Sequence, residues 1–398
     1  MTQTAAPGDH IDETDLISPG RRSLGRAVIW VASALFALII LLQILNVTGS
    51  LDLGFANWRP TMYAYLGWSI ALGFGLVMIR GEQGMRALFI LPATLFTLAV
   101  VIFPTLFGLS IAFTDWNLAS LTGGKFNGVD NLVQLWHDAY FWNALGNMVF
   151  YVVMVLVEYA IAFGLALLLN AEIRARKFWR VVFLIPFMLS PVAVSWMIGK
   201  SMMEYRYGPV ARLMRMIGWD QPTFFVDPWI ARLSIEAMDA WVSIPFIMIL
   251  LLAGLQALPK DVQEAARVDG ATPWQSFWQI TFPLMLPVSV TAIILRIIFK
   301  LKLADIVINV TSGGPGGATD TVSSFIYREY RDRSNVGYGT MLAMVYLVII
   351  IVFITILLNL VSKRMQRMTR WLRSPKPSTS PRSGRSRQAS ADAASARC

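Results

Sequence analysis

Long apolar windows recur along this chain of 398 residues, and they constrain its fold more than any other feature. Hydrophobic residues make up 56% of the sequence and charged residues only 15%, whereas soluble domains are about 45–50% apolar and about 25% charged. A run of about 20 apolar residues is long enough for a helix to cross a bilayer. The sequence therefore predicts an all-α integral membrane protein, with eight spans expected near residues 24–46, 62–80, 87–113, 145–169, 178–200, 229–254, 285–306 and 338–361.

Arginines and lysines in the short loops predict the orientation. They gather before the first span, between the second and third, between the fourth and fifth, and after the last. With eight spans these four places lie on one side, which the positive-inside bias makes cytoplasmic. Both termini are then expected in the cytoplasm. The segment 201–228 falls outside despite three arginines, and its sequence is typical of an amphipathic external helix.

Several kinds of chemistry are excluded or disfavoured. The single cysteine, Cys398, rules out a disulfide framework within the chain, and only His10 and His137 could supply an imidazole, so we expect no metal site. No phosphate-binding G-x-x-x-x-G-K-[ST] motif is present, so any ATP and Mg²⁺ must be used by another chain. The basic run after Val361 could bind nucleic acid. Because it directly follows a span, a cytoplasmic flank near anionic lipid is favoured, and no nucleic-acid partner is expected.

A polar stretch, EAARVDGATPWQSFWQITFP, separates the sixth and seventh spans. Gly270 can take the left-handed conformation that ends a helix. Thr272 is suited to the N-cap of a second helix, with Pro273 in its first turn and Gln275 closing a capping box. The pattern predicts two short helices held between two spans, which we call the hook. Such a hook could dock a partner or lie on the bilayer surface, and the physics of the sequence leaves both open.

The hook resembles the EAA loop of ABC importer permeases. Glu264-Ala265-Ala266, three residues, Gly270, nine residues and Ile280 follow the family spacing, although Phe282 replaces the usual leucine before Pro283. Other blocks, FVDPWIARLSIEAMDAWVSIPF and DIVINVTSGGPGGATDT among them, resemble the sugar-importer branch that includes maltose and glycerol-3-phosphate permeases. The resemblance covers about residues 87–361.

The resemblance implies a function and a set of partners. The chain would be a permease subunit of an ATP-driven importer of a sugar, polyol or glycoside in a bacterial cytoplasmic (inner) membrane. It would pair with a second permease subunit, bind two copies of an ATPase with that subunit, and receive solute from an extracytoplasmic binding protein. The residues expected to dock the ATPase are Glu264, Ala265, Ala266, Asp269, Gly270 and Ala271.

The composition of the two ends and the resemblance of the core together predict a domain order. Residues 1–20 are expected to be a disordered terminus, 21–84 two additional spans, 85–363 the six-span permease core with its EAA loop at 260–283, and 364–398 a basic disordered tail. In the core, the resemblance places Lys302, Asp305, Gly313, Gly314 and Pro315 along the solute pathway. Arg296 and Lys300 are also expected there for their charge, although they depart from the family pattern.

Charges inside the predicted spans pose a separate question, because such residues usually face a cavity or a partner. They include Glu158, Glu236 and Asp239. Glu158 and Arg296 are both expected near the middle of their spans, where they could neutralise each other. Alternatively, Arg296 and Lys300 could face the pathway and attract an anionic group on the solute. The pair is the favoured interpretation.

Two other function classes stay open at this stage. Kinked spans with buried charges are also found in ion-driven secondary transporters, although we find no halved repeat of the spans. A membrane-bound enzyme would need a nucleophile, base or metal cluster, and none is visible.

Overall fold

The computed structural model describes residues 18–47, 58–120 and 124–373. Within these ranges the secondary structure is helical apart from two isolated β-bridges. The described part holds six helices that are long and apolar enough to cross a membrane, and one bent helix pair that could form a further span. The predicted all-α membrane fold is confirmed.

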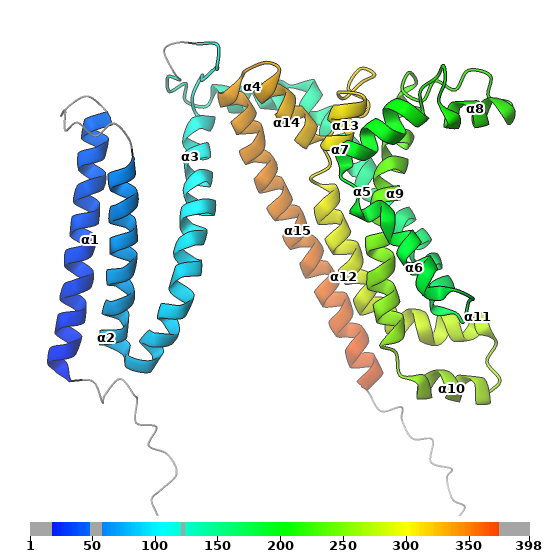
Figure 1. Ribbon diagram of the computed structural model, residues 1–398, viewed down its shortest axis with the longest axis horizontal. Coiled ribbons are helices and arrows are strands. Elements are labelled where there is room, and N and C mark those ends of the chain that lie inside the picture. Colours follow the sequence, from blue (N-terminus) through cyan, green and yellow to red (C-terminus); the bar gives the residue numbers. More distant parts are fainter. Residues whose placement is uncertain (1–17, 48–57, 121–123, 374–398) are drawn as a thin grey trace, which may run out of the picture. The chain divides into compact units, whose positions relative to one another are not determined.

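One of these six segments contains two of the predicted spans. Arg59–Ala112 comprises α2 (Arg59–Thr97), a π-helical turn and α3 (Phe103–Ala112), which together are 54 residues. A straight helix of that length would extend about 80 Å, far more than a bilayer is thick. At Gly81 the backbone leaves the helical region (φ 57°, ψ −124°), and the chain reverses there (Figure 1). The 54-residue segment is therefore a hairpin of two arms.

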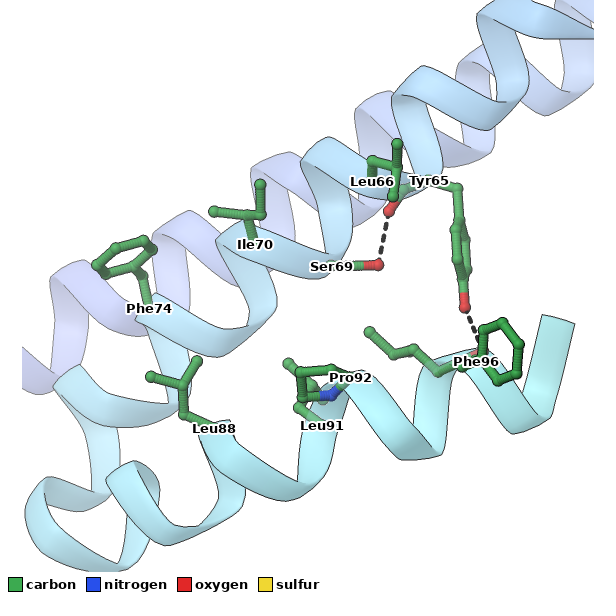
Figure 2. Close-up of a pocket in the computed structure, with 10 residues that line it drawn as sticks. Tyr65, Leu66, Ser69, Ile70, Phe74, Leu88, Leu91, Pro92 and Phe96 are labelled. Carbon is green, nitrogen blue, oxygen red and sulfur yellow. Dashed lines mark hydrogen bonds between the residues drawn. The ribbon is translucent and has the colours of Figure 1, made fainter.

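Two compact units make up the chain, Met1–Ser110 and Ile111–Cys398. In the first, α1 (Pro19–Val47) packs along α2, with Phe36 stacked on Trp68 at a ring separation of 5.3 Å. The two arms of α2 face a groove of about 460 Å³ lined almost wholly by apolar side chains (Figure 2). The Tyr65 hydroxyl donates a hydrogen bond of 2.6 Å across it to the carbonyl of Leu95. This bond ties the arms together.

The second unit is a helix bundle. Its long helices are α5 (Ala139–Asn170), α9 (Pro228–Gln256), α12 (Phe282–Lys300) and α15 (Val336–Arg373). The predicted span 178–200 is not straight, because Arg176–Met188 (α6 and a 3₁₀ turn) and Pro191–Met202 (α7 and a π-helical turn) meet at 92°. Pro186 and Pro191 lie near the break, where proline removes helical hydrogen bonds.

Short helices gather at the two ends of this bundle (Figure 1). At one end lie α4 (Asp130–His137), α8 (Pro209–Met216), α13 (Asp305–Val310) and α14 (Val322–Arg331). At the other end lies the hook, which consists of α10 (Lys260–Val268), α11 (Pro273–Ser276) and a π-helical turn at Phe277–Thr281.

The structure differs from the predicted boundaries in three places. Helix α12 ends at Lys300 and not near 306, because Tyr346, Ser323 and Thr321 donate to the carbonyls of residues 301 and 303 and so replace further helical bonds. Helix α15 continues to Arg373, ten residues into the predicted disordered tail. The compact units divide after Ser110, whereas the core was expected from residue 85. Most of the predicted disordered N-terminus and the tail after residue 373 lie outside the described residues.

Candidate functional site

The hook has the local geometry that its sequence predicts. Gly270 has φ +76°, and the Ala271 N–H returns to the Ala266 carbonyl at 3.0 Å, which closes the end of α10. The Thr272 hydroxyl accepts from the Gln275 N–H at 3.3 Å, while the Gln275 side chain accepts from the Thr272 N–H at 2.9 Å. This reciprocal pair is the expected capping box. The angle between the two short helices is thus fixed by local bonds.

Most of the residues expected to dock an ATPase lie on the surface. The side chains of Glu264, Ala265 and Asp269 are exposed, whereas Ala266 is buried. Val268, at the end of α10, is 87% exposed, and Arg267 beside it is exposed as well. The hook therefore presents a mixed face of apolar and charged side chains.

Aromatic rings anchor the second arm of the hook to the bundle. Phe277 meets Phe163 of α5 edge to face, with ring centroids 5.7 Å apart, and it contacts Phe282 at the start of α12. Phe163 also contacts Phe282, so the three rings form one cluster. The hook is tied by covalent bonds to α9 and α12 and by this cluster to α5.

A buried charge cluster joins the same three helices. It takes Glu158 from α5, Glu236 and Asp239 from α9, and Arg296 and Lys300 from α12. Arg296 donates to both oxygens of Glu158, from Nε at 2.5 Å and from Nη2 at 3.0 Å, and it also donates to Asp239. Lys300 Nζ donates to Glu158 at 2.8 Å, to Glu236 at 2.7 Å and to Asp239 at 2.5 Å.

This geometry decides between the two interpretations of the intramembrane charges. Arg296 and Glu158 form the expected pair. Lys300 is fully buried and Arg296 nearly so, and both donate to more than one carboxylate. In this conformation neither presents free positive charge to a solute, so the expectation that they line the pathway is not supported.

The three helices contribute to the cluster from different points along their lengths. Lys300 is the last residue of α12, and Glu236 and Asp239 lie in the third and fourth turns of α9. Glu158 precedes Phe163 by five residues on α5, so the cluster lies at the end of α12 remote from the hook but closer to the middle of α5.

One oxygen from each of Glu158, Glu236 and Asp239 lies within 4.8 Å of the others, a spacing that could suit a metal ion. Here the ammonium group of Lys300 and the guanidinium group of Arg296 occupy the positions between these oxygens. The donor set is thus already neutralised by side chains, and it does not fit a resident metal.

The glycine-rich segment after α13 is held against the bundle. Asn147 of α5 donates to the carbonyls of Gly317 and Asp320, both at 2.9 Å, and Arg232 of α9 donates to that of Ala318 at 2.7 Å. A side chain at Gly313 would meet the carboxylate of Asp320 at 2.8 Å, so glycine is required there. Gly314 and Pro315 are half-buried, which places this part of the expected pathway in an ordered turn.

Lys302 and Asp305 are exposed and take no part in the cluster. Asp305 begins α13, where its carboxylate interacts favourably with the positive end of the helix dipole. Sequence reasoning missed the ion pair between buried Asp320 and Arg328 and the two hydrogen bonds of Asn147. The sequence feature that could have identified Asn147 is its polar amide inside a predicted span.

Residues 159–369, which include the hook and four of the five charges, match the family described as binding-protein-dependent transport system inner membrane components. The chain belongs to this family. Over 270 residues the permease is 32% identical to the sulfoquinovosyl glycerol transport system permease protein SmoG of Agrobacterium fabrum, a match that spans 67% of this chain and 86% of that one. It is also 32% identical over 267 residues to the trehalose/maltose transport system permease protein MalF of Thermococcus litoralis, spanning 66% and 89% of the two chains.

The permease also has solved structural neighbours. A bacterial alginate ABC transporter, crystallised with an alginate pentasaccharide-bound periplasmic protein, aligns with a TM-score of 0.61 at 23% identity, covering 71% of this chain and 96% of that one. At this identity the likeness shows the fold alone. The sequence relatives are sugar ABC transporter permeases, so the protein is a multi-pass carbohydrate permease component and not a catalytic enzyme.

Proposed function

We propose that this permease couples ATP hydrolysis in a separate subunit to import of a sugar, polyol or glycoside, and that the hook is the coupling element. The observation that supports this most is the combination of an exposed α10 and a rigid attachment. Glu264 and Val268 face outward, while Gly270, Thr272 and the ring of Phe277 fix the hook to the bundle. A rigid element with an exposed face can transmit a partner's movement.

The movement would pass to three helices as one body. At the hook, Phe277 and Phe282 pack on Phe163 and so join α12 to α5. Farther along, Arg296 and Lys300 join α12 to both α5 and α9. Because α12 is joined to its neighbours near both of its ends, a displaced hook would move α5, α9 and α12 together and not bend α12 alone.

The remaining partners follow from the same proposal. A second permease subunit would complete the pathway, two ATPase copies would bind the two hooks, and an extracytoplasmic binding protein would deliver solute. The hook side, with the termini, would face the bacterial cytoplasm. Relatives are named for sulfoquinovosyl glycerol, trehalose/maltose and maltodextrin, which supports a carbohydrate but leaves a wide range of solutes.

Co-purification tests the docking role of the hook. Glu264→Lys reverses an exposed charge on α10, and we expect it to reduce ATPase retention on the purified permease without changing affinity for the solute-binding protein. Glu82→Lys, which reverses another exposed glutamate in the first unit, is the control and should retain the ATPase. Equal retention in both variants would contradict docking through Glu264. Uptake by this chain alone, driven by an ion gradient in liposomes, would overturn the ATP-driven proposal itself.

A further inference from the structure

We infer that the buried charge cluster binds one proton and that Glu236 carries it. The cluster contains three carboxylates and two cations, so its charge is −1 if all five groups are ionised. An uncompensated charge in the interior of a membrane bundle is strongly unfavourable. One bound proton makes the cluster neutral.

The contacts identify the acid that holds it. Glu158 has both oxygens engaged, since Oε2 accepts from Arg296 at 2.5 Å and Oε1 accepts from Arg296 at 3.0 Å and from Lys300 at 2.8 Å. Asp239 Oδ2 accepts from both cations, and its side chain keeps 13% exposure. Each of these two acids is therefore held as a carboxylate by two cationic donors.

Glu236 has the weakest support for a negative charge. Its Oε2 accepts only from Lys300, at 2.7 Å, and Lys300 is shared with the other two acids. Its Oε1 is buried and has no hydrogen-bond partner, and the whole residue is only 3% exposed. An ionised oxygen left without a donor in such a place is unfavourable. A proton on Oε1 turns it into a donor beside carboxylates that have acceptor capacity to spare.

One further cation lies near Glu236, but among the described residues it forms no ion pair with the cluster. Arg232, one turn away on α9, donates to the Ala318 carbonyl at 2.7 Å, and the hydroxyl of Tyr151 on α5 faces the Thr319 carbonyl at 3.4 Å. The side chains that α7 and α13 pack against this part of α9 are apolar: Val194, Ile306, Val307 and Val310. Among the described residues, the ion pairs of the cluster therefore join its five members alone, and Arg232 is directed to a backbone carbonyl.

Infrared difference spectroscopy of the purified full-length chain in lipid nanodiscs tests the inference. A protonated carboxyl gives a carbonyl stretch that a carboxylate lacks. We expect this band in the wild type and its loss in Glu236→Gln. It should also be lost in Asp239→Asn, because two carboxylates then balance two cations and Glu236 ionises. Glu329→Gln, which removes another buried glutamate outside the cluster, should keep the band.

Several results would overturn the inference. The band could persist in Glu236→Gln, which would place the proton elsewhere. It could be absent from the wild type, as it would be if a metal ion balanced the charge. Glutamine mimics the protonated acid, so a Glu236→Gln chain that fails to assemble while Asp239→Asn assembles would also contradict it.

A pH series gives an independent readout. The unfolded chain releases this proton near the ordinary glutamate pKa of about 4.3, so the melting temperature of the wild type should fall as pH rises above that value and level off once the folded cluster has also lost its proton. Glu236→Gln has no proton to lose and should show a flatter dependence. Equal slopes for the two proteins would count against the site. None of these measurements requires the ATPase, so their outcome is separate from the test of the hook.

Discussion

Arg296 and Glu158 lie 138 residues apart in sequence, yet their side chains form a two-point contact that joins α12 to α5. Removal of one member of a buried, hydrogen-bonded pair typically costs about 3–5 kcal/mol, because the other charge is left uncompensated. Arg296→Met should therefore strongly reduce assembly and thermal stability. Glu158→Gln in the same chain should restore much of the loss, as measured by yield and melting temperature.

An exposed pair provides the matched control for that cycle. Arg86 and Glu82 face each other across one helical turn, at 4.0 Å and largely exposed to their surroundings. Exposed pairs of this kind contribute about 0–1 kcal/mol. Arg86→Met should leave the melting temperature almost unchanged. If Arg296→Met behaves like Arg86→Met, the buried pair does not hold the bundle together.

Gly270 provides a test of the turn in the hook. Its φ of +76° is unfavourable for a β-branched residue, by about 1–2 kcal/mol, while the space beside it is open. Gly270→Val should thus change the backbone turn without a steric clash, and the permease should still insert but lose transport-coupled ATP hydrolysis. Gly128→Val, at φ +64° and also in open space, lies outside the hook and should keep coupling. Normal transport in Gly270→Val membranes would refute the role of this turn.

The ring of Phe277 should separate docking from transmission. Its truncation removes the contact with Phe163 but leaves the exposed face of α10 intact. Phe277→Ala should keep the ATPase bound and allow ATP hydrolysis while solute uptake falls. Trp274→Ala, which removes a mostly exposed ring on the same arm, should have a smaller effect on uptake. Loss of ATPase binding in Phe277→Ala would mean that this ring shapes the docking face itself.

Asn147 provides a test of the segment at the far end of the bundle. Replacement by leucine removes this donor from both carbonyls; Gly317 keeps its bond from Asn143, but the Asp320 carbonyl loses its side-chain donor, and an unsatisfied buried polar group costs about 1–3 kcal/mol. Asn147→Leu should lower the melting temperature and impair solute uptake, with ATPase co-purification unchanged. Asn143→Leu removes a single bond to Gly317 from an exposed side chain and should be milder. Equal effects would show that burial does not set the importance of these bonds.

Local rules were enough to predict the hook from sequence. The left-handed Gly270 and the capping box at Thr272 each depend on a few neighbouring residues, and both are present as expected. The pairing of Glu158 with Arg296 was also predicted, because a charge inside a span needs a partner. The recruitment of Glu236 and Asp239 was not, since it depends on how α9 rotates against α12, and apolar residues on every side of a span hide that rotation.

Helix boundaries were harder to predict where distant side chains replace helical bonds. The end of α12 at Lys300 depends on a hydroxyl of α15 that reaches the Leu301 carbonyl from 45 residues away. The pair of Asp320 and Arg328 similarly depends on how α14 folds back after the glycines. Neither contact leaves a local pattern in the sequence.

The ring contact between Phe163 and Phe277 has a consequence for protein engineering. A chimaera that grafts residues 257–283 into a related permease would transfer the hook with its turn and caps. It would not transfer Phe163, the ring on α5 against which the hook packs. Such a graft should recruit the donor's ATPase and still import poorly. Exchange of position 163 together with the graft should recover import. The smallest set of residues that transfers coupling from this protein therefore comes from two separate parts of the sequence.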